Sequence, residues 1–226
     1  MMTISEGRST EVLSAQLEAF IPPLSSVEQR ISLELIRLLS RGKPASLDGL
    51  AKQLDLTLEE VERVLSAWTG VKRDANGDVQ GYWGFDLEPT QHELDIEGTT
   101  LYAWGAWDAL FLPELIGRSV GVRSTCPVTR QGIDIEVGLD RILQADSKTV
   151  LSFLFPPQGT PLHETDAHTY CRFVHFFSST AAGSAWCARH SGTFLISLEQ
   201  GFQLGHLKNT RRYAHEWGGM HQDGPA

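Results

Sequence analysis

The first 86 residues carry the feature that most constrains the fold, a series of short amphipathic helices that ends in a tight hairpin turn. Apolar residues recur at helical spacing in four successive segments: residues 9–20, 26–42, 44–56 and 57–68. Thr57 and Glu60 are spaced as a capping box, in which two side chains satisfy free N–H groups at the start of a helix. Asn76 and Gly77 are typical of a tight turn between two strands. This order of elements predicts a winged helix-turn-helix over residues 1–86.

The rest of the sequence has a pattern that is typical of β-strands with a few helices. Strand-like runs occupy residues 92–98, 119–126, 132–140, 149–157 and 169–179. Helical spacing predicts helices over residues 101–117 and 182–192, and a polar loop is expected at residues 157–168. Residues 87–207 therefore form the second part of an α+β chain. Residues 208–226, which are rich in Gly and His, are expected to be a flexible tail.

Charge and composition limit the partners of the protein. The 226 residues carry a formal net charge of −9, whereas a general nucleic-acid binder is normally basic. The last helix before the hairpin contains Glu59, Glu60 and Glu62, and Arg63 is its only base, so phosphates would repel it. We therefore expect no nucleic-acid partner. No apolar run approaches the length of a membrane span, which predicts a cytoplasmic protein without a membrane partner.

The three cysteines do not form a recognisable disulfide framework. Cys126, Cys171 and Cys187 are an odd set at wide, irregular spacing. Reduced thiols in a reducing compartment are the better interpretation. Each cysteine is then either a small buried apolar residue or a ligand or nucleophile.

Asp108 is the candidate acid, because its neighbours in the expected helix 101–117 are mainly aromatic and aliphatic. An ionised carboxylate in such surroundings is unfavourable, so burial would raise its pKa and allow it to donate a proton near neutral pH. Gly105 lies three residues earlier, where a glycine inside a helix costs about 0.5–1 kcal/mol relative to alanine. Trp104 and Trp107 are interpreted as core residues rather than as a stacking platform for a ligand.

Structural explanations stay open for several other residues. The candidate acid could be paired with Arg118 or Arg172 rather than act in catalysis. His175 lies in an apolar strand-like run and is typical of a core histidine. His215 and His221 flank a Gly-containing stretch of the expected tail and indicate a solvated segment rather than a metal site. No HExxH, CxxC, GxGxxG or P-loop motif occurs in the sequence.

Several segments together resemble the organomercurial (alkylmercury) lyase family. The similarity includes "LYAW-x-x-x-D-x-L-x-x-P-x-LIGR", the cysteine of "RSTC", "C-x-x-VHFF" and a later "W-x-x-x-H", and it extends over residues 25–207. The resemblance implies protonolysis of a carbon–mercury bond, in which two cysteine thiolates bind mercury and an aspartate protonates the departing carbon. Thiolates are the preferred ligands of a soft cation. The implied fold is a winged-helix-like N-terminal region followed by a mixed β-sheet with helices.

The resemblance also implies roles for individual residues. Asp108 matches the catalytic aspartate of the family, Cys171 matches its second catalytic cysteine, and Cys126 matches a structural one. The first catalytic cysteine of the family falls on Gly105. If residues 101–117 are helical, Gly105 and Asp108 share one face, which keeps the acid and loses a thiolate. Cys187 has no catalytic counterpart and is a weak candidate for replacing this ligand.

Three functions remain open. The first is an organomercurial lyase in which Cys171 binds mercury and Asp108 donates the proton, impaired by Gly105. The second is a divergent family member that acts on or binds a non-mercurial small molecule or metal, and the third is a non-catalytic regulator. We expect Trp104 and Trp107 to line the pocket, and Gly105 to leave a space there, although neutral drift would also explain this glycine. No cofactor is required, Hg(II) would be a product ligand, the partner is a small molecule or soft metal ion, and the oligomeric state is open.

Overall fold

The computed structural model describes residues 9–18, 20–21, 23–155 and 170–216. The described N-terminal region contains the helices α1 (Thr10–Glu18), α2 (Ser26–Leu39), α3 (Leu47–Leu54) and α4 (Leu58–Ala67). Ser25 with Glu28, and Thr57 with Glu60, form capping boxes at the starts of α2 and α4. The predicted starts of these two helices are confirmed. They could be predicted because residues of the helix ends themselves supply the hydrogen-bond acceptors that the first turns need.

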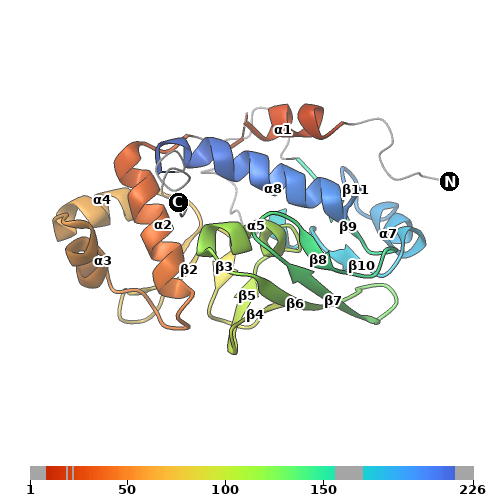
Figure 1. Cartoon of the computed structure of the whole chain (residues 1–226), viewed down its shortest axis with the longest axis horizontal. Coiled ribbons are helices and arrows are strands. Elements are labelled where there is room, and N and C mark those ends of the chain that lie inside the picture. The colour runs from red at the N-terminus through yellow and green to blue at the C-terminus, as the bar shows by residue number, and fades with distance from the viewer. Residues whose placement is uncertain (1–8, 19, 22, 156–169, 217–226) are drawn as a thin grey trace, which may run out of the picture.

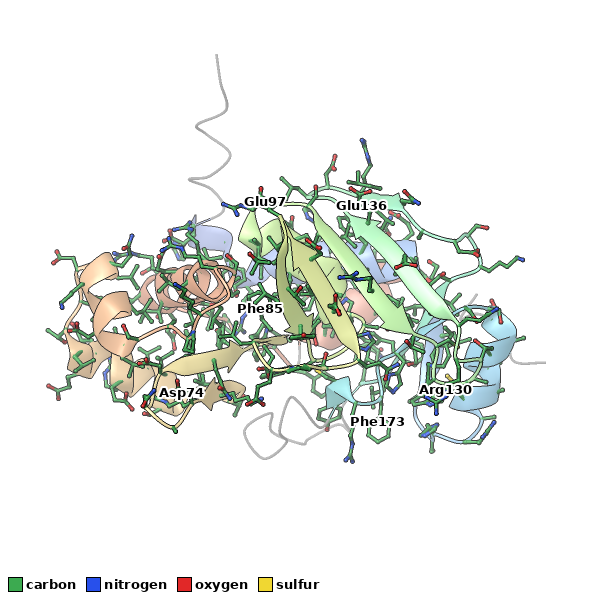
Figure 2. All side chains as sticks on the ribbon, turned by 90° about the horizontal axis from the view of Figure 1, so that it is seen from below. Asp74, Phe85, Glu97, Arg130, Glu136 and Phe173 are labelled. Carbon is green, nitrogen blue, oxygen red and sulfur yellow. The ribbon has the colours of Figure 1, made fainter. Side chains whose placement is uncertain are left out.

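The predicted hairpin follows α4. Its strands β1 (Val71–Arg73) and β2 (Val79–Tyr82) are antiparallel. The Asp74 carboxylate accepts N–H groups of Asn76 and Asp78 in the turn, and Gly77 adopts a φ of 87°. β2 then pairs with β3 (Phe85–Asp86), which in turn pairs with β5 (Thr99–Ala103). The hairpin is therefore continuous with the larger sheet, and Phe85 marks this junction in Figure 2.

The larger sheet contains five further strands: β4 (His92–Ile96), β5 (Thr99–Ala103), β6 (Val120–Thr125), β7 (Gly132–Val137) and β8 (Ile142–Gln144). The strand order is β1-β2-β3-β5-β4-β6-β7-β8. The α+β class is confirmed, but the sheet is not mixed, since every pair among the described strands is antiparallel. Short hairpin connections such as the one between β4 and β5 allow only antiparallel pairing.

A smaller sheet and three helices complete the described structure. β9 (Val150–Phe153) lies between β10 (Phe176–Phe177) and β11 (Phe194–Ser197), again antiparallel. The helices are α5 (Asp108–Ile116), α7 (Thr180–Cys187) and α8 (Leu198–Arg212). Figure 1 shows α8 running across the molecule above α5, and α8 packs against both α1 and α5. The candidate site lies between α8, α1 and α5.

The expected helix over residues 101–117 is wrong in its first half. Residues up to Ala103 belong to β5, and α5 begins only at Asp108. Leu101 and Ala103 are buried on one face of the sheet, and they pair with Leu94 and His92 of β4. The apolar residues of this stretch satisfy a period of two as well as a helical period, and pairing with β4 decides between them.

A third expectation differs from the structure, and a fourth is not tested by it. Residues 169–179 were expected as one strand, but among the described residues 170–179 only Phe176 and Phe177 belong to a strand. Before them the chain turns, because the N–H of Phe173 donates to the carbonyl of Tyr170 and the N–H of Val174 donates to the carbonyl of Cys171. The loop expected at residues 157–168 lies outside the described residues.

The C-terminal segment is ordered as far as the structure describes it, so the expectation of a flexible tail is wrong for residues 208–216. Asn209 and Tyr213 are fully buried. The Asn209 amide donates to the carbonyl of Phe111, and the hydroxyl groups of Tyr213 and Ser32 are 2.8 Å apart. These contacts join the end of α8 to α5 and α2. Residues 217–226 lie outside the described residues.

Candidate active site

A largely apolar cavity of about 120 Å³ lies between α1, α5 and α8. Asp108, Cys171 and Lys208 bring an acid, a thiol and an amine to this cavity. Its other lining residues are Leu17, Phe20, Ile21, Trp83, Gly84, Trp104, Trp107, Phe111, Phe153, Leu154, Tyr170 and Val174. The structure thus brings the candidate acid, the candidate thiol and the two tryptophans to one cavity, together with an amine that was not among the candidates.

Asp108 is held at the start of α5 and is 7% exposed. Its Oδ2 accepts the backbone N–H of Gly105 at 2.9 Å, and its carboxyl group is hydrogen-bonded to the Cys171 side chain. Burial raises the pKa of Asp108 to about 7. The hydrogen bond with Cys171, the charge of Lys208 and the N–H of Gly105 act in the opposite direction. A carboxyl group in this state can both accept and donate a proton near neutral pH.

The expected arginine partners of the acid are elsewhere. Arg118 binds Glu97 at 2.8 Å on the surface, and the Arg172 guanidinium lies 4.9 Å from the centre of the Phe173 ring. The structural alternative of an Asp–Arg pair is therefore wrong for these two residues.

Gly84 forms the wall behind the acid. A Cβ atom at this position would lie 2.5 Å from Cγ of Asp108, and the residue has a φ of +94° that side-chain-bearing residues rarely adopt. The Gly84 carbonyl also accepts the N–H of Trp104 at 2.9 Å. Gly84 thus lets the turn between β2 and β3 come directly against the carboxyl group.

We expect Gly84→Ala to destabilise the protein more than Gly98→Ala. Both glycines have positive φ, +94° and +85°, so either alanine carries the left-handed cost of about 1–2 kcal/mol. Only at position 84 does the new methyl group overlap Asp108, while nothing lies within 4 Å at position 98, so a further 1–3 kcal/mol or so is expected there. Urea denaturation measures both variants, and equal losses would contradict a wall formed by Gly84.

Gly105 precedes α5 instead of lying inside a helix, so the expected shared helical face with Asp108 is wrong. A Cβ atom on Gly105 would lie 3.0 Å from the carbonyl oxygen of Cys171 and 3.2 Å from its Cβ. The next residue, Ala106, donates its N–H to the carbonyl of Val174 at 2.9 Å. The backbone around Cys171 therefore packs directly on Gly105. The space that we expected at this glycine is filled by that segment.

Cys126 and Cys187 are not among the cavity residues, and both are buried free thiols. Cys126 lies in the turn after β6, where its Sγ accepts the N–H of Thr129 at 3.5 Å. Burial acts to raise the pKa of Cys126, but hydrogen bonds from Thr129 and neighbouring N–H groups outweigh it and lower the pKa to about 7. Burial raises the pKa of Cys187. The structure does not bring Cys187 to the acid, so it is no substitute ligand in this conformation.

Lys208 is the functional candidate that the sequence analysis missed, because it lay in the expected tail. Its side chain is buried, and Nζ lies 3.0 Å from the centre of the Phe111 ring without a hydrogen-bond partner among the described residues. Burial and the nearby Arg212 hold the pKa of Lys208 well below its usual value. The signal in the sequence was the helical spacing of Gly201, Gly205, Lys208 and Arg212, which marks one buried face of α8.

The side chains of the two tryptophans and of His175 make contacts that stabilise the fold. Trp104 donates its indole N–H to Asp86, and Trp107 donates to the carbonyl of Gly201, both at 2.9 Å. His175 is outside the cavity lining and packs against Trp186, with ring centres 5.2 Å apart.

The histidines of the expected tail form no site in the described structure. The backbone N–H of His215 donates to Gln29, and His221 lies outside the described residues. Among the described residues, no three His, Cys, Asp or Glu side chains are grouped to hold a metal ion. No helix in this part of the chain is both long and apolar enough to cross a membrane.

The sequence and fold match known proteins. Residues 85–208 match the family model described as alkylmercury lyase, and residues 13–83 match the helix-turn-helix domain of alkylmercury lyase. The alkylmercury lyase of Bacillus cereus is 36% identical over 177 residues, which cover 78% of this chain and 79% of that protein. The alkylmercury lyase of Pseudomonas putida is 34% identical over 173 residues, which cover 76% and 80%. A crystal structure described as the mercury-bound form of MerB2 shares the fold, with a TM-score of 0.68, 21% identity and coverage of 88% of this chain and 96% of that one. The chain therefore belongs to the alkylmercury lyase family.

Proposed function

We propose that the protein cleaves a carbon–mercury bond by protonolysis, with Cys171 as the sulfur ligand and Asp108 as the proton donor. The observation that carries the proposal is the hydrogen bond between these two side chains inside an apolar cavity. A carboxyl group whose pKa is about 7 exchanges protons readily at physiological pH. The family relationship supports the same reaction class.

The proposed reaction uses one proton twice. When an organomercury cation binds, the Cys171 thiol passes its proton to the Asp108 carboxylate and the resulting thiolate forms a sulfur–mercury bond. Asp108 then gives this proton to the carbon that is bound to mercury. The electron pair of the carbon–mercury bond stays with carbon, the hydrocarbon leaves, and Hg(II) remains on sulfur. The apolar walls favour this sequence because they exclude competing water from the acid.

Gly105 is the main reason to expect a weakened enzyme. At the position where the family resemblance implies a first catalytic cysteine, this chain has no thiol. One thiolate from Cys171 is then the only sulfur that the described cavity residues supply. A second sulfur ligand, which would stabilise Hg(II) as the bond breaks, has to come from outside the chain.

The proposal is tested with purified, reduced protein, phenylmercury and excess thiol, by following benzene release with gas chromatography. We expect release by the natural protein and its loss in Cys171→Ser. Cys187→Ser is the matched control, because this thiol is buried outside the cavity, and it is expected to retain activity. Absence of benzene with the natural protein, or equal activity of the two variants, would count against the proposal.

Binding of a small non-mercurial molecule is the second candidate, which the apolar cavity with one buried amine favours. Asp108→Ala separates the two, since it abolishes turnover by a lyase and leaves binding by a pure carrier intact.

The N-terminal region has a structural role in this proposal rather than a DNA-binding one. Glu59 and Glu60 lie in the first turn of α4, where they would repel the phosphates of a nucleic acid. Glu62 forms an ion pair with Arg73 of the hairpin at 3.0 Å, so this arginine is already neutralised and is not available to bind a phosphate. The substrate is accordingly a small molecule, and no nucleic-acid partner is included.

A further inference from the structure

A second cavity of about 260 Å³ adjoins the candidate active site between α1 and α8. The two cavities share Leu17, Ile21 and Lys208 in their linings. The second cavity is further lined by Ser14, Glu18, Pro23, Arg211 and Arg212. Lys208 therefore lies at the boundary between an apolar chamber that holds the acid and thiol and a basic chamber beside it.

The basic chamber has more cationic than anionic side chains. Arg211 is bound to Glu18 and also donates to Ser14 Oγ at 2.8 Å, so the single carboxylate in the lining is already neutralised. The Arg212 guanidinium is 4.2 Å from the centre of the Trp83 ring, which lines the first cavity. Nζ of Lys208 is buried without a hydrogen-bond partner among the described residues. A buried amine without a hydrogen-bond partner is unfavourable unless a ligand supplies an acceptor for its N–H groups.

We propose that the basic chamber binds the carboxylate of a small thiol, and that this thiol supplies the second sulfur ligand to mercury in the neighbouring chamber. The inference rests on the proposed function and identifies its substrate class: an organomercury thiolate whose thiol carries a carboxylate. The apolar chamber takes the organic group and mercury, and the basic chamber takes the anionic end.

The chemistry explains why the thiol stays bound during the reaction. A soft cation prefers thiolate ligands, and the described site offers one, from Cys171. The thiolate of Cys171 adds to mercury while the existing sulfur–mercury bond of the substrate is kept. Asp108 then protonates carbon, the carbon–mercury bond breaks, and Hg(II) is left between two sulfur atoms. Mercury is neither oxidised nor reduced, and the hydrocarbon is the only leaving group.

The charge of the subsite depends on its ligand. Burial and Arg212 disfavour the protonated form of Lys208, whereas a carboxylate placed beside Nζ would favour it. A charge-assisted bond of this kind, in surroundings with little water, distinguishes an anionic thiol from a neutral one of the same size.

The test measures binding of methylmercury complexes of three thiols: 3-mercaptopropionate, its uncharged amide and cysteamine. Methylmercury carries no charge on its organic group, so any preference reports on the thiol. Titration calorimetry with excess of each thiol is expected to give at least about tenfold tighter binding for 3-mercaptopropionate than for the amide. Cysteamine is expected to bind more weakly than the amide. Similar affinities for all three complexes would overturn the inference.

Variants connect this preference to the basic chamber. Lys208→Met keeps the length of the side chain and removes its amine, and it is expected to abolish the preference. Lys148→Met is the matched control on the surface and is expected to retain it. Arg211→Gln, at a half-exposed residue, is expected to reduce the preference severalfold, which keeps the test decisive if Lys208→Met does not fold. An unchanged preference in Arg211→Gln and Lys208→Met would overturn the assignment to this chamber.

Two further measurements distinguish a failure of the proposed function from a failure of the carboxylate subsite. Binding that prefers the anionic thiol without hydrocarbon release would contradict the proposed function and support the subsite. Hydrocarbon release at equal rates from all three complexes, with equal binding, would support the function and contradict the subsite. A carboxyphenylmercury complex of the uncharged amide thiol provides the other source of a carboxylate. If only that complex shows the dependence on Lys208, the anion belongs to the organic group and the thiol assignment is wrong.

Discussion

Replacing Asp108 with asparagine is expected to reduce hydrocarbon release about 100- to 10,000-fold, the usual contribution of a positioned acid. Asparagine has nearly the same shape, and its carbonyl oxygen can still accept the N–H of Gly105, but it has no proton to give to carbon. Binding of the organomercurial should change much less, because Cys171 remains. Single-turnover measurements, with binding measured separately, check the prediction. Asp134→Asn, on the exposed face of β7, is the control and should be fully active.

The same substitution also changes how stability depends on pH. In the folded protein Asp108 keeps its proton up to a pH of about 7, whereas in an unfolded chain the carboxyl group has its ordinary pKa of 3.8. Between these values the folded state binds more protons, so this residue makes the free energy of unfolding fall as the pH rises, by at most about 1.4 kcal/mol per pH unit. The Asp108→Asn variant lacks this slope. Its free energy of unfolding should therefore increase relative to that of the natural protein as the pH rises from 4 to 7. Urea titrations measure the difference in free energy of unfolding between the variant and the natural protein. The same difference at pH 5 and at pH 7.5 would contradict a carboxyl group that is buried in its neutral form.

Introducing a thiol at Gly105 is expected to have the other large effect. Gly105→Cys should bind Hg(II) about 100- to 10,000-fold more tightly than the natural protein, because a second sulfur on the same chain has a high effective concentration. The Cβ of the new residue would lie 3.2 Å from that of Cys171. Competition with a chromogenic chelator measures affinity, and benzene release measures turnover. We expect the dependence on an external thiol to fall together with the gain in affinity.

Close packing at Gly105 sets the controls for this variant. Cβ atoms of a disulfide lie at about 3.5–4.5 Å, so the pair could oxidise after a small shift, and the protein has to be assayed fully reduced. Gly105→Ala introduces the same steric demand on the Cys171 backbone without sulfur. If the alanine variant gains as much affinity as the cysteine variant, the gain is conformational, and the site has no use for a second thiolate.

Much of the architecture follows from local sequence signals. The capping box that begins α4 and the turn at Gly77 were predictable, because nearby residues satisfy the backbone there without help from the rest of the chain. Asp108 was recognisable because an acid among aromatic residues needs an explanation. Cys171 was recognisable only through the family resemblance.

Other features depend on contacts between distant segments. The stretch around Leu101 satisfies both helical and strand periods, and only the neighbouring β4 selects the strand. The packing of the Cys171 backbone on Gly105 has no sequence signature, since the residues are far apart in the chain. Lys208 was hidden because the polar composition of the C-terminal segment suggested exposure, whereas contacts with Phe111 and its neighbours bury it.

The continuity between the hairpin and the large sheet affects how this chain can change during evolution. The turn between β2 and β3 supplies Trp83 and Gly84 to the cavity, and Gly84 lies directly against the acid. The N-terminal region therefore forms part of the wall of the apolar chamber and is not an appended module. A gene rearrangement that exchanged it for another helix-turn-helix would also replace one wall of the chamber. Natural selection on the shape of this chamber therefore acts on both parts together, and they are expected to be inherited as one unit.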